Sequence, residues 1–378
     1  TIKQSRSTTF SFRYFEKPTR NMVSPISYGS CASQTSFAMK ESLLSMDQLE
    51  TMLNVERKYR VPRILCQAAP EINDSHPYSE WRRKICQWSF KVIDHYKFDR
   101  EVVSRAMNVL DRYLFMKINF QRDKTDNSPD DASIETVDSR TYQLAAMTSL
   151  YLAIKLSCND EREYLSSRKL SLNSFVELSR GQFYSDEITE MERVILQDLQ
   201  WEVFPPTPMT SVYYLLCMMP SHETLPYTCH KSYNLVLRVL HQLARYLTEL
   251  SVCHAGICTA YTSSQVAYAS ILLSMELLTP IALPIYARDK FNEVVALTSI
   301  RSGGTSLSSQ DKNIKYLQDL LRESFEPEIL VEDCEYAEIG HPISMAKVFG
   351  LLDTSHIVSA HHTIATNSAS PSYCAPLS

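Results

Sequence analysis

Residues 139–156 read SRTYQLAAMTSLYLAIKL, and at the spacing of an α-helix this stretch leaves no clean polar face. A helix that is apolar all round is buried on most of its sides. Small residues such as Ala145, Ala146 and Ala153 let neighbouring helices come close. The stretch therefore predicts a central helix that other helices surround.

Apolar residues recur at three- and four-residue intervals on both sides of this stretch, which is typical of amphipathic helices. The helices predicted around it cover 81–96, 102–114, 172–178 and 185–199. A further helix is predicted ahead of them over 43–60, ending before Pro62. The acidic segment 118–138 is predicted to be a solvated loop.

A second block follows the segment Phe204-Pro205-Pro206-Thr207-Pro208, which cannot be helical and predicts an extended linker. The helices predicted in it cover 209–218, 232–250, 263–278, 284–297 and 307–325. Residues 263–278 are again apolar all round, like 139–156. Two blocks of about 120 residues with the same order of helices predict an internal repeat. Strand patterns are negligible, so the predicted fold is all-α: two tandem five-helix repeats with an N-terminal helix and flexible tails.

The composition narrows the class of protein. The chain has 378 residues, 44% hydrophobic and 21% charged, which suffices for one large or two ordinary globular domains. Its seven glycines lie far apart, except for Gly303 and Gly304, so no Walker A, Rossmann or kinase phosphate loop can be built. A net charge of -5 and a pI near 6.1 give no basic surface for nucleic acid.

The cysteines and the termini bear on compartment and cofactors. The ten cysteines include no Cys-x-x-Cys pair, which predicts reduced thiols in a nuclear or cytoplasmic protein. Cys253, His254 and Cys258 form the nearest approach to a ligand cluster, but no second pair completes a zinc site, so no metal or other cofactor is expected. The uncharged stretch 250–275 carries too many polar residues to span a bilayer and predicts a buried helix after a turn. The first 40 residues lack the apolar segment of a signal peptide.

Five residues stand out in order along the first block. Arg82 lies near the start of the first helix, Asp111 begins Asp-Arg-Tyr-Leu in the second, and Leu144 and Lys155 lie eleven apart in the third. Glu192 lies in the fifth. Together they resemble the cyclin box. The resemblance covers roughly 81–208 well, and 209–325 only in the pattern of helices. The combination of features is more similar to the divergent cyclins of diatoms than to any animal class of cyclins.

The resemblance implies a domain plan and roles for these residues. It implies a disordered Ser/Thr-rich region (1–42), an N-terminal helix and linker (43–80), an N-terminal cyclin box (81–207), a C-terminal cyclin fold (208–325) and a flexible tail (326–378). Arg82, Asp111 and Leu144 would be structural. Lys155 and Glu192 would grip the regulatory helix of a cyclin-dependent kinase, with apolar neighbours Leu152, Leu156 and Trp201. From the residues alone, a solvated ion pair within the chain is an equally good interpretation of Lys155 and Glu192.

The implied activity is regulation of a kinase in a heterodimer, during cell-cycle control, and not catalysis by this chain. A rigid helical surface would bind the active kinase conformation better and shift its population. Cyclins also dock Arg-x-Leu substrate peptides on their first helix, where this chain has Trp81, Ile85 and Trp88. Lys91 stands where an acid would meet the ligand's arginine, and its charge disfavours such docking.

Three alternatives remain open. A transcription factor of the TFIIB type shares the fold, but the acidic pI and the lack of paired cysteines disfavour it. An enzyme on a helical scaffold would have only scattered histidines, such as His361 and His362, for its chemistry. A transcription-associated cyclin would take a different kinase, and the helix at 43–60 favours the cell-cycle type.

Overall fold

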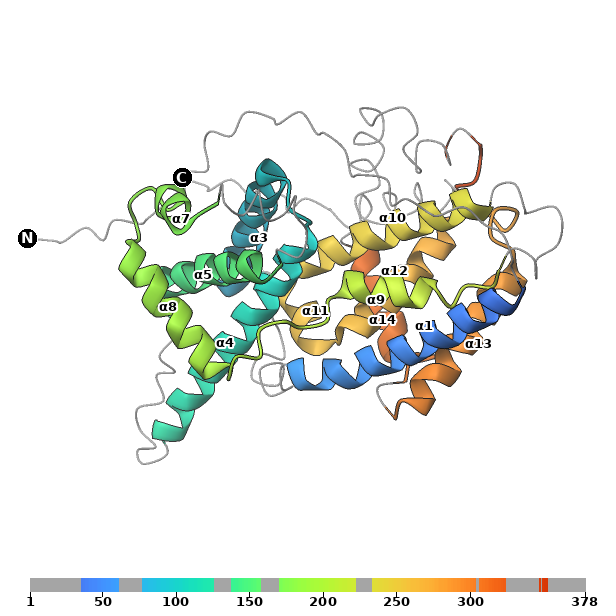
Figure 1. The fold of residues 1–378 in the computed structure, drawn as a ribbon, viewed down its shortest axis with the longest axis horizontal. Coiled ribbons are helices and arrows are strands. Elements are labelled where there is room, and N and C mark those ends of the chain that lie inside the picture. The colour runs from blue at the N-terminus through green and yellow to red at the C-terminus, as the bar shows by residue number, and fades with distance from the viewer. Residues whose placement is uncertain are drawn as a thin grey trace, which may run out of the picture. The chain divides into compact units, whose positions relative to one another are not determined.

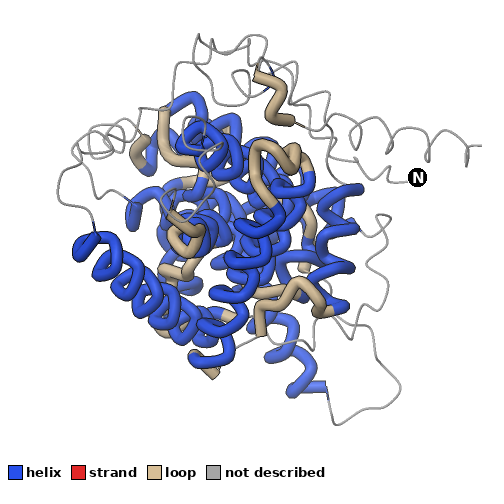
Figure 2. The backbone as a smooth tube through the Cα atoms, turned by 90° about the vertical axis from the view of Figure 1, so that its right-hand side faces the viewer, coloured by secondary structure: helices blue, strands red, loops and turns tan. Residues whose placement is uncertain are grey.

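The computed structural model describes residues 35–60, 77–125, 137–157, 170–221, 233–303, 306–323, 347 and 349–352. In these ranges the ordered elements are helices and no strand occurs, as Figure 2 shows. Leu278 and Leu352 form an isolated antiparallel bridge, so a segment that follows the last helix in the chain contacts the backbone at Leu278. The all-α prediction is confirmed. No described helix combines the length and the apolar character that a membrane crossing requires.

The first group of helices is built around the helix that the sequence singled out. It comprises α3 (Pro77–Tyr96), α4 (Glu101–Thr125), α5 (Ser139–Ser157), α7 (Leu172–Leu178) and α8 (Ser185–Asp198). Buried residues lie on every side of α5, which packs against α3, α4, α7 and α8. Leu150, Phe175 and Ile195 are fully buried in the shared core. The prediction of a central helix is confirmed.

The second group surrounds α12 in the same manner. It comprises α9 (Pro208–Leu216), α10 (Tyr233–Val252), α11 (Ala255–Ala260), α12 (Ser263–Glu276), α13 (Ile285–Arg301) and α14 (Lys312–Glu323). Helix α12 packs against α9, α10 and α14 (Figure 1). Its Tyr268 is fully buried. The Thr262 hydroxyl accepts the backbone N–H of Gln265 and caps the helix. That the two groups repeat one another stays a prediction.

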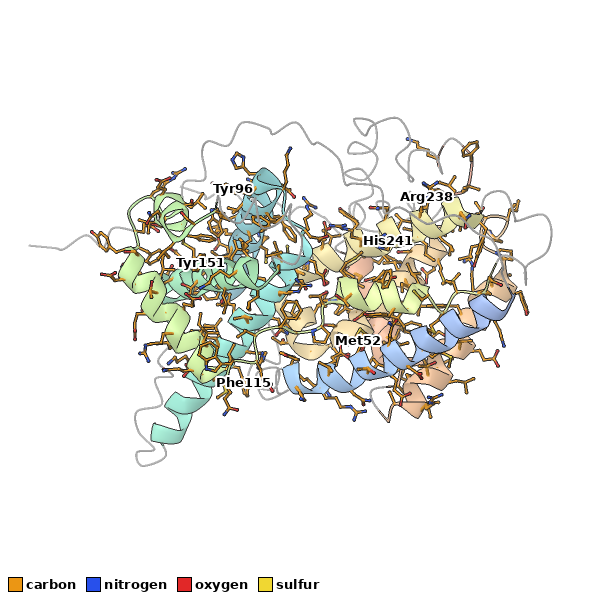
Figure 3. All side chains as sticks on the ribbon, viewed as in Figure 1. Met52, Tyr96, Phe115, Tyr151, Arg238 and His241 are labelled. Carbon is orange, nitrogen blue, oxygen red and sulfur yellow. The ribbon has the colours of Figure 1, made fainter. Side chains whose placement is uncertain are left out.

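Helix α1 (Thr35–Glu56) precedes the first group in the chain but packs on the second. Leu49, Met52 and Leu53 are buried in the second core. The helix packs against α9 and α13 (Figure 1), and Figure 3 labels Met52 on it. The Glu56 carboxylate accepts the backbone N–H of Ser264 at 2.7 Å and its hydroxyl at 2.6 Å. A carboxylate there is favourable because the first turn of α12 has unpaired N–H groups and a positive dipole end. A 3₁₀ helix, η1 (Arg57–Tyr59), follows.

Helix boundaries differ from the sequence prediction at several places. Helix α1 begins at Thr35 and not near residue 43, and α4 continues to Thr125, into the segment predicted to be a loop. The short helix α11 was not predicted. Leu307, expected to open the last helix, lies before it. Its side chain is buried and its N–H donates to the Ser299 hydroxyl at 3.0 Å, so it anchors a loop.

Several predictions concern residues outside the described ranges. The segments outside are the Ser/Thr-rich segment up to residue 34 and most of the tail after 325, which includes His361 and His362. Residues 126–136 of the predicted loop and Gly304 lie outside as well.

Candidate functional site

Lys155 and Glu192 are brought together by the packing of α5 against α8. The Lys155 Nζ lies 2.6 Å from Glu192 Oε1, and 5.1 Å from the centre of the Tyr151 ring. The Lys155 side chain is 47% exposed and that of Glu192 14%. An ammonium group has three donors, so the exposed Lys155 can bind a further acceptor from outside. Solvent reaches the pair at Lys155 and screens the attraction there, while Glu192 is largely covered.

The three apolar residues expected beside this pair lie at different depths. Leu152 is 3% exposed and belongs to the core of the first group. Leu156 is 38% exposed at the end of α5, and Trp201 is 70% exposed after α8. Only Leu156 and Trp201 therefore offer apolar surface to a partner, while Leu152 supports the helix from inside.

Trp201 is held outward by an unusual turn of the backbone. Gln200 and Trp201 both adopt left-handed conformations, with φ angles of 52° and 65°. Residues other than glycine rarely adopt this region, and such strain clusters at functional sites. The Trp201 N–H donates to the Leu196 carbonyl at 2.9 Å, which closes the end of α8. The turn thus fixes the point at which a large exposed indole leaves the helix.

The sequence prediction missed two residues near the end of α5 and the turn at Trp201, namely Arg105 and Phe204. The Arg105 guanidinium lies 4.5 Å from the centre of the Phe204 ring, which is partly exposed. Arg105 also donates to the Ser157 hydroxyl at 2.8 Å and pairs with Glu101 at 3.2 Å. Glu101 and Arg105 are four residues apart, a helical spacing that could have predicted their ion pair. The stacking of Arg105 on Phe204 joins residues that are far apart in the chain, so no local sequence pattern indicates it.

Arg82 and Asp111 form a buried ion pair between α3 and α4. Arg82 donates to both carboxylate oxygens, with Nη2 to Oδ2 at 3.0 Å, and its Nε donates to the Val252 carbonyl at 3.0 Å. Burial alone lowers the pKa of Arg82, but the charge of Asp111 outweighs it and holds the pKa above the usual value. Burial raises the pKa of Asp111, and the charge and hydrogen bonds of Arg82 counteract part of this effect. Leu144, on α5, is buried in the core of the first group.

The residues expected to form a peptide-docking patch lie on α3. Ile85 is buried in the core, whereas Trp81 and Trp88 are half-buried and pack against it. The Trp81 and Tyr142 rings lie 5.5 Å apart. Lys91 is exposed. The apolar surface of this helix is therefore contributed by the two tryptophans.

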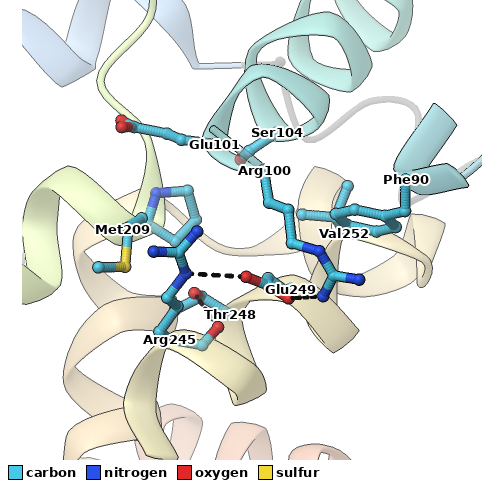
Figure 4. Close-up of a pocket in the computed structure, with 10 residues that line it drawn as sticks. Phe90, Arg100, Glu101, Ser104, Met209, Arg245, Thr248, Glu249 and Val252 are labelled. Atoms are coloured by element: carbon cyan, nitrogen blue, oxygen red, sulfur yellow. Dashed lines mark hydrogen bonds and ion pairs between the residues drawn. The ribbon is translucent and has the colours of Figure 1, made fainter. Parts of the chain in front are cut away.

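A small pocket lies where α3 and α4 meet α9 and α10 (Figure 4). Glu249 binds two arginines there, Arg100 at 2.5 Å and Arg245 at 3.0 Å. Asp94 and Asp99 provide second carboxylates to Arg100 and Arg245, respectively. Because carboxylates balance both arginines, the pocket is no attractive site for an anion.

The cluster Cys253, His254 and Cys258 is not arranged as a metal site. Among the described residues, no group of three or more His, Cys, Asp or Glu side chains could hold a metal ion. The positive charge of Arg82 acts on the thiols of Cys253 and Cys258 and opposes binding of a cation there.

Comparison with known proteins finds a family match over part of the chain. Residues 47–204 match the family model described as the cyclin N-terminal domain. The G1/S-specific cyclin CLN2 of Candida albicans is 25% identical over 61% of this chain and 43% of its own length. The G1/S-specific cyclin-D1 of Danio rerio is 26% identical over 48% of this chain and 53% of its own. The G2/mitotic-specific cyclin-A of Drosophila melanogaster is 25% identical over 62% of this chain and 40% of its own length. The chain thus spans roughly half, or less, of these relatives' lengths.

Proposed function

We propose that the chain is a divergent cyclin, in keeping with the match of residues 47–204 to the cyclin N-terminal domain, and that it binds and activates a cyclin-dependent kinase through the α5–α8 surface. We define this surface as Lys155, Leu156, Glu192 and Trp201. The kinase supplies the ATP site and the catalytic residues, and this chain acts as its regulatory subunit in cell-cycle control.

The observation that carries the proposal is the ion pair Lys155–Glu192 with exposed apolar residues on the same two helices. Leu156 and Trp201 present apolar area to solvent, and tryptophan is among the residues enriched at binding hot spots. The ion pair is open to solvent at Lys155, and we expect a partner to bind it at that side. A charged centre with apolar neighbours suits a helix that carries both kinds of residue.

Activation follows from preferential binding. A kinase exchanges between an inactive and an active arrangement of its regulatory helix, and a rigid surface that fits only the active one shifts the population. A shift from 1:99 to 99:1 requires a preference of about 5.5 kcal/mol. The described surface is anchored on α5, whose surroundings are closely packed, so it can favour one conformation without deforming.

Affinity purification of the tagged full chain from its own cells tests the proposal. We expect a cyclin-dependent kinase to copurify, and the double variant Lys155→Ala, Glu192→Ala to recover at least about tenfold less of it, a loss of about 1.4 kcal/mol of binding free energy. The matched control is Lys290→Ala, Glu293→Ala, which removes another exposed ion pair, 2.8 Å long, on α13.

The control should recover as much kinase as the unaltered chain, and all three proteins should unfold at similar temperatures. Full kinase binding and activation by the Lys155, Glu192 variant, with the fold intact, would contradict the assignment of this surface.

A further inference from the structure

Three residues of α4 hold the linker that follows α8. They lie four and seven positions apart, a spacing that places all three on one face of the helix. Figure 1 shows the chain leaving the end of α8 and passing α4 on its way to α9. In order along the linker, the contacts are Arg112 with the Glu202 carbonyl, Arg105 with the Phe204 ring, and Glu101 with the Thr207 hydroxyl. Arg112 therefore binds the residue that directly follows Trp201.

The turn at Gln200 and Trp201 needs support from outside itself. Both residues are left-handed without being glycine, so their conformation costs free energy that the surrounding structure must offset. The Trp201 side chain is 70% exposed, so burial of the indole does not provide this support. Val203, two residues further on, is buried in the core of the first group. The backbone at Glu202 therefore connects an outward indole to an inward valine, and its orientation decides where the indole points.

Arg112 fixes the backbone at Glu202. Its Nη1 donates to the Glu202 carbonyl oxygen at 2.5 Å, a hydrogen bond that the charge of the guanidinium strengthens. The Arg112 Cζ lies 5.0 Å from the centre of the Tyr59 ring, so the last residue of η1 covers the guanidinium and restrains it. Burial lowers the pKa of Arg112, but an arginine keeps its proton in a protein, so the donor stays charged.

We propose that Arg112 is a positioning residue for the α5–α8 surface, and that its hydrogen bond to the Glu202 carbonyl sets the direction of Trp201. The effect of Arg112 on kinase binding rests on the proposed function, whereas its effect on Trp201 does not. An indole that is held in one direction in the free protein loses less conformational entropy when a partner covers it. Because Tyr59 restrains Arg112, the segment that follows α1 also contributes to this surface.

Fluorine NMR of the full chain labelled with 5-fluorotryptophan tests the position of Trp201. The chain has three tryptophans, at positions 81, 88 and 201, and Trp201→Phe identifies the resonance of the third. We expect Arg112→Ala to shift the Trp201 resonance by more than its linewidth and to leave the other two in place. Arg112→Lys keeps a cationic donor for the Glu202 carbonyl, so it should return the resonance most of the way.

Arg140→Ala is the matched control. Arg140 likewise donates to a backbone carbonyl, that of Gln182 at 3.2 Å, and lies 4.9 Å from the centre of the Phe183 ring. Its removal should leave the Trp201 resonance in place. Tyr59→Ala removes only the ring that restrains Arg112 and should broaden the same resonance, which keeps the test open if Arg112→Ala does not fold.

Two results of the fluorine spectra would overturn the proposal. One is an unmoved Trp201 resonance in a folded Arg112 variant, or in Tyr59→Ala where no Arg112 variant folds. The other is an equal movement in Arg140→Ala, which would show that loss of any such arginine disturbs the turn. A purely structural role of Arg112 predicts a lower unfolding temperature with the Trp201 resonance unchanged.

Copurification of the kinase tests the consequence for binding. We expect Arg112→Ala to recover about fivefold less kinase than the unaltered chain, because Trp201 is present but less well ordered. Arg140→Ala should recover the full amount. Full recovery by Arg112→Ala with a moved Trp201 resonance would overturn the role of Arg112 in binding. If the unaltered chain recovers no kinase, the proposed function fails, and the fluorine spectra alone decide whether Arg112 positions Trp201.

Discussion

Arg82 holds three parts of the chain with one side chain. Its guanidinium pairs with Asp111 on α4 and donates to the Val252 carbonyl at the end of α10. A buried ion pair is weak evidence for stability, because desolvation offsets much of the attraction. Removing one partner is a different matter, since it leaves a charge buried without compensation.

Asp111→Asn should lower the free energy of unfolding by about 3–5 kcal/mol, because Arg82 stays buried and charged. Urea denaturation at neutral pH measures this. The double variant Arg82→Met, Asp111→Leu, which removes both charges, should regain most of the loss. If Asp111→Asn alone lowered the free energy of unfolding by less than about 1 kcal/mol, the pair would be neutral or hydrated, contrary to this argument.

At the scale of elements, α1 fastens to the second group through a buried carboxylate. Burial raises the pKa of Glu56 above its ordinary value of 4.5, while hydrogen bonds from Ser264 counteract part of this effect. As the pH rises from 4.5 to the raised pKa, the unfolded state gives up its proton first and the native state keeps it longer. The native state binds more protons in this window, so the stability contributed by Glu56 falls as the pH rises.

Glu56→Gln should remove this pH dependence, because an amide does not titrate. The difference in unfolding free energy between the unaltered chain and the variant is expected to decrease steadily as urea titrations move from pH 4.5 upward. The partly buried Glu50, which pairs with Arg301 at 3.2 Å, lies on the same helix, and Glu50→Gln serves as the matched control that should leave the dependence unchanged. A difference that grows with pH would contradict the argument.

At the scale of the whole molecule, the two cores meet at the end of α10. Val252 is buried in the first core although α10 belongs to the second group. Around it Glu249 accepts hydrogen bonds from Arg100 on one side and Arg245 on the other (Figure 4). Asp94 and Asp99 complete this network, so several charges depend on one another.

Glu249→Gln should lower the free energy of unfolding by about 2 kcal/mol, because two partly buried arginines lose a shared carboxylate. Urea unfolding should also become less cooperative, with a smaller dependence on denaturant, since the two cores are less strongly coupled. Glu190→Gln removes half of an exposed pair with Arg193 on α8 and should change the stability by less than about 0.5 kcal/mol. Equal losses in the two variants would contradict a special role for the junction.

The sequence predicted the parts of this molecule that follow from local periodicity. Helices α5 and α12 were predicted because their residues are apolar on every side, and the structure buries them accordingly. The pairing of Lys155 with Glu192 needed a family resemblance, because their 37-residue separation has no local pattern. The solvated-pair interpretation describes their geometry, and their role in binding stays a prediction.

The rest depends on contacts that no helical repeat encodes. Nothing in the residues around Glu56 indicates that its carboxylate caps α12, more than 200 positions later. The left-handed turn at Gln200 and Trp201 lacks the glycine that would have announced it. Likewise Cys86 and Cys258 meet at Val252 only because α3 packs on the end of α10.

The docking of α1 on the second group has a consequence for synthesis on the ribosome. Among the described helices α1 is translated first, yet its partners α9 and α13 come from the far half of the chain. At 5–20 residues per second, those partners leave the exit tunnel only after about ten seconds or more. During that delay the stripe of Leu49, Met52 and Leu53 has no native surface to cover it. The nascent chain therefore offers chaperones an apolar helix for longer than any other part of the fold.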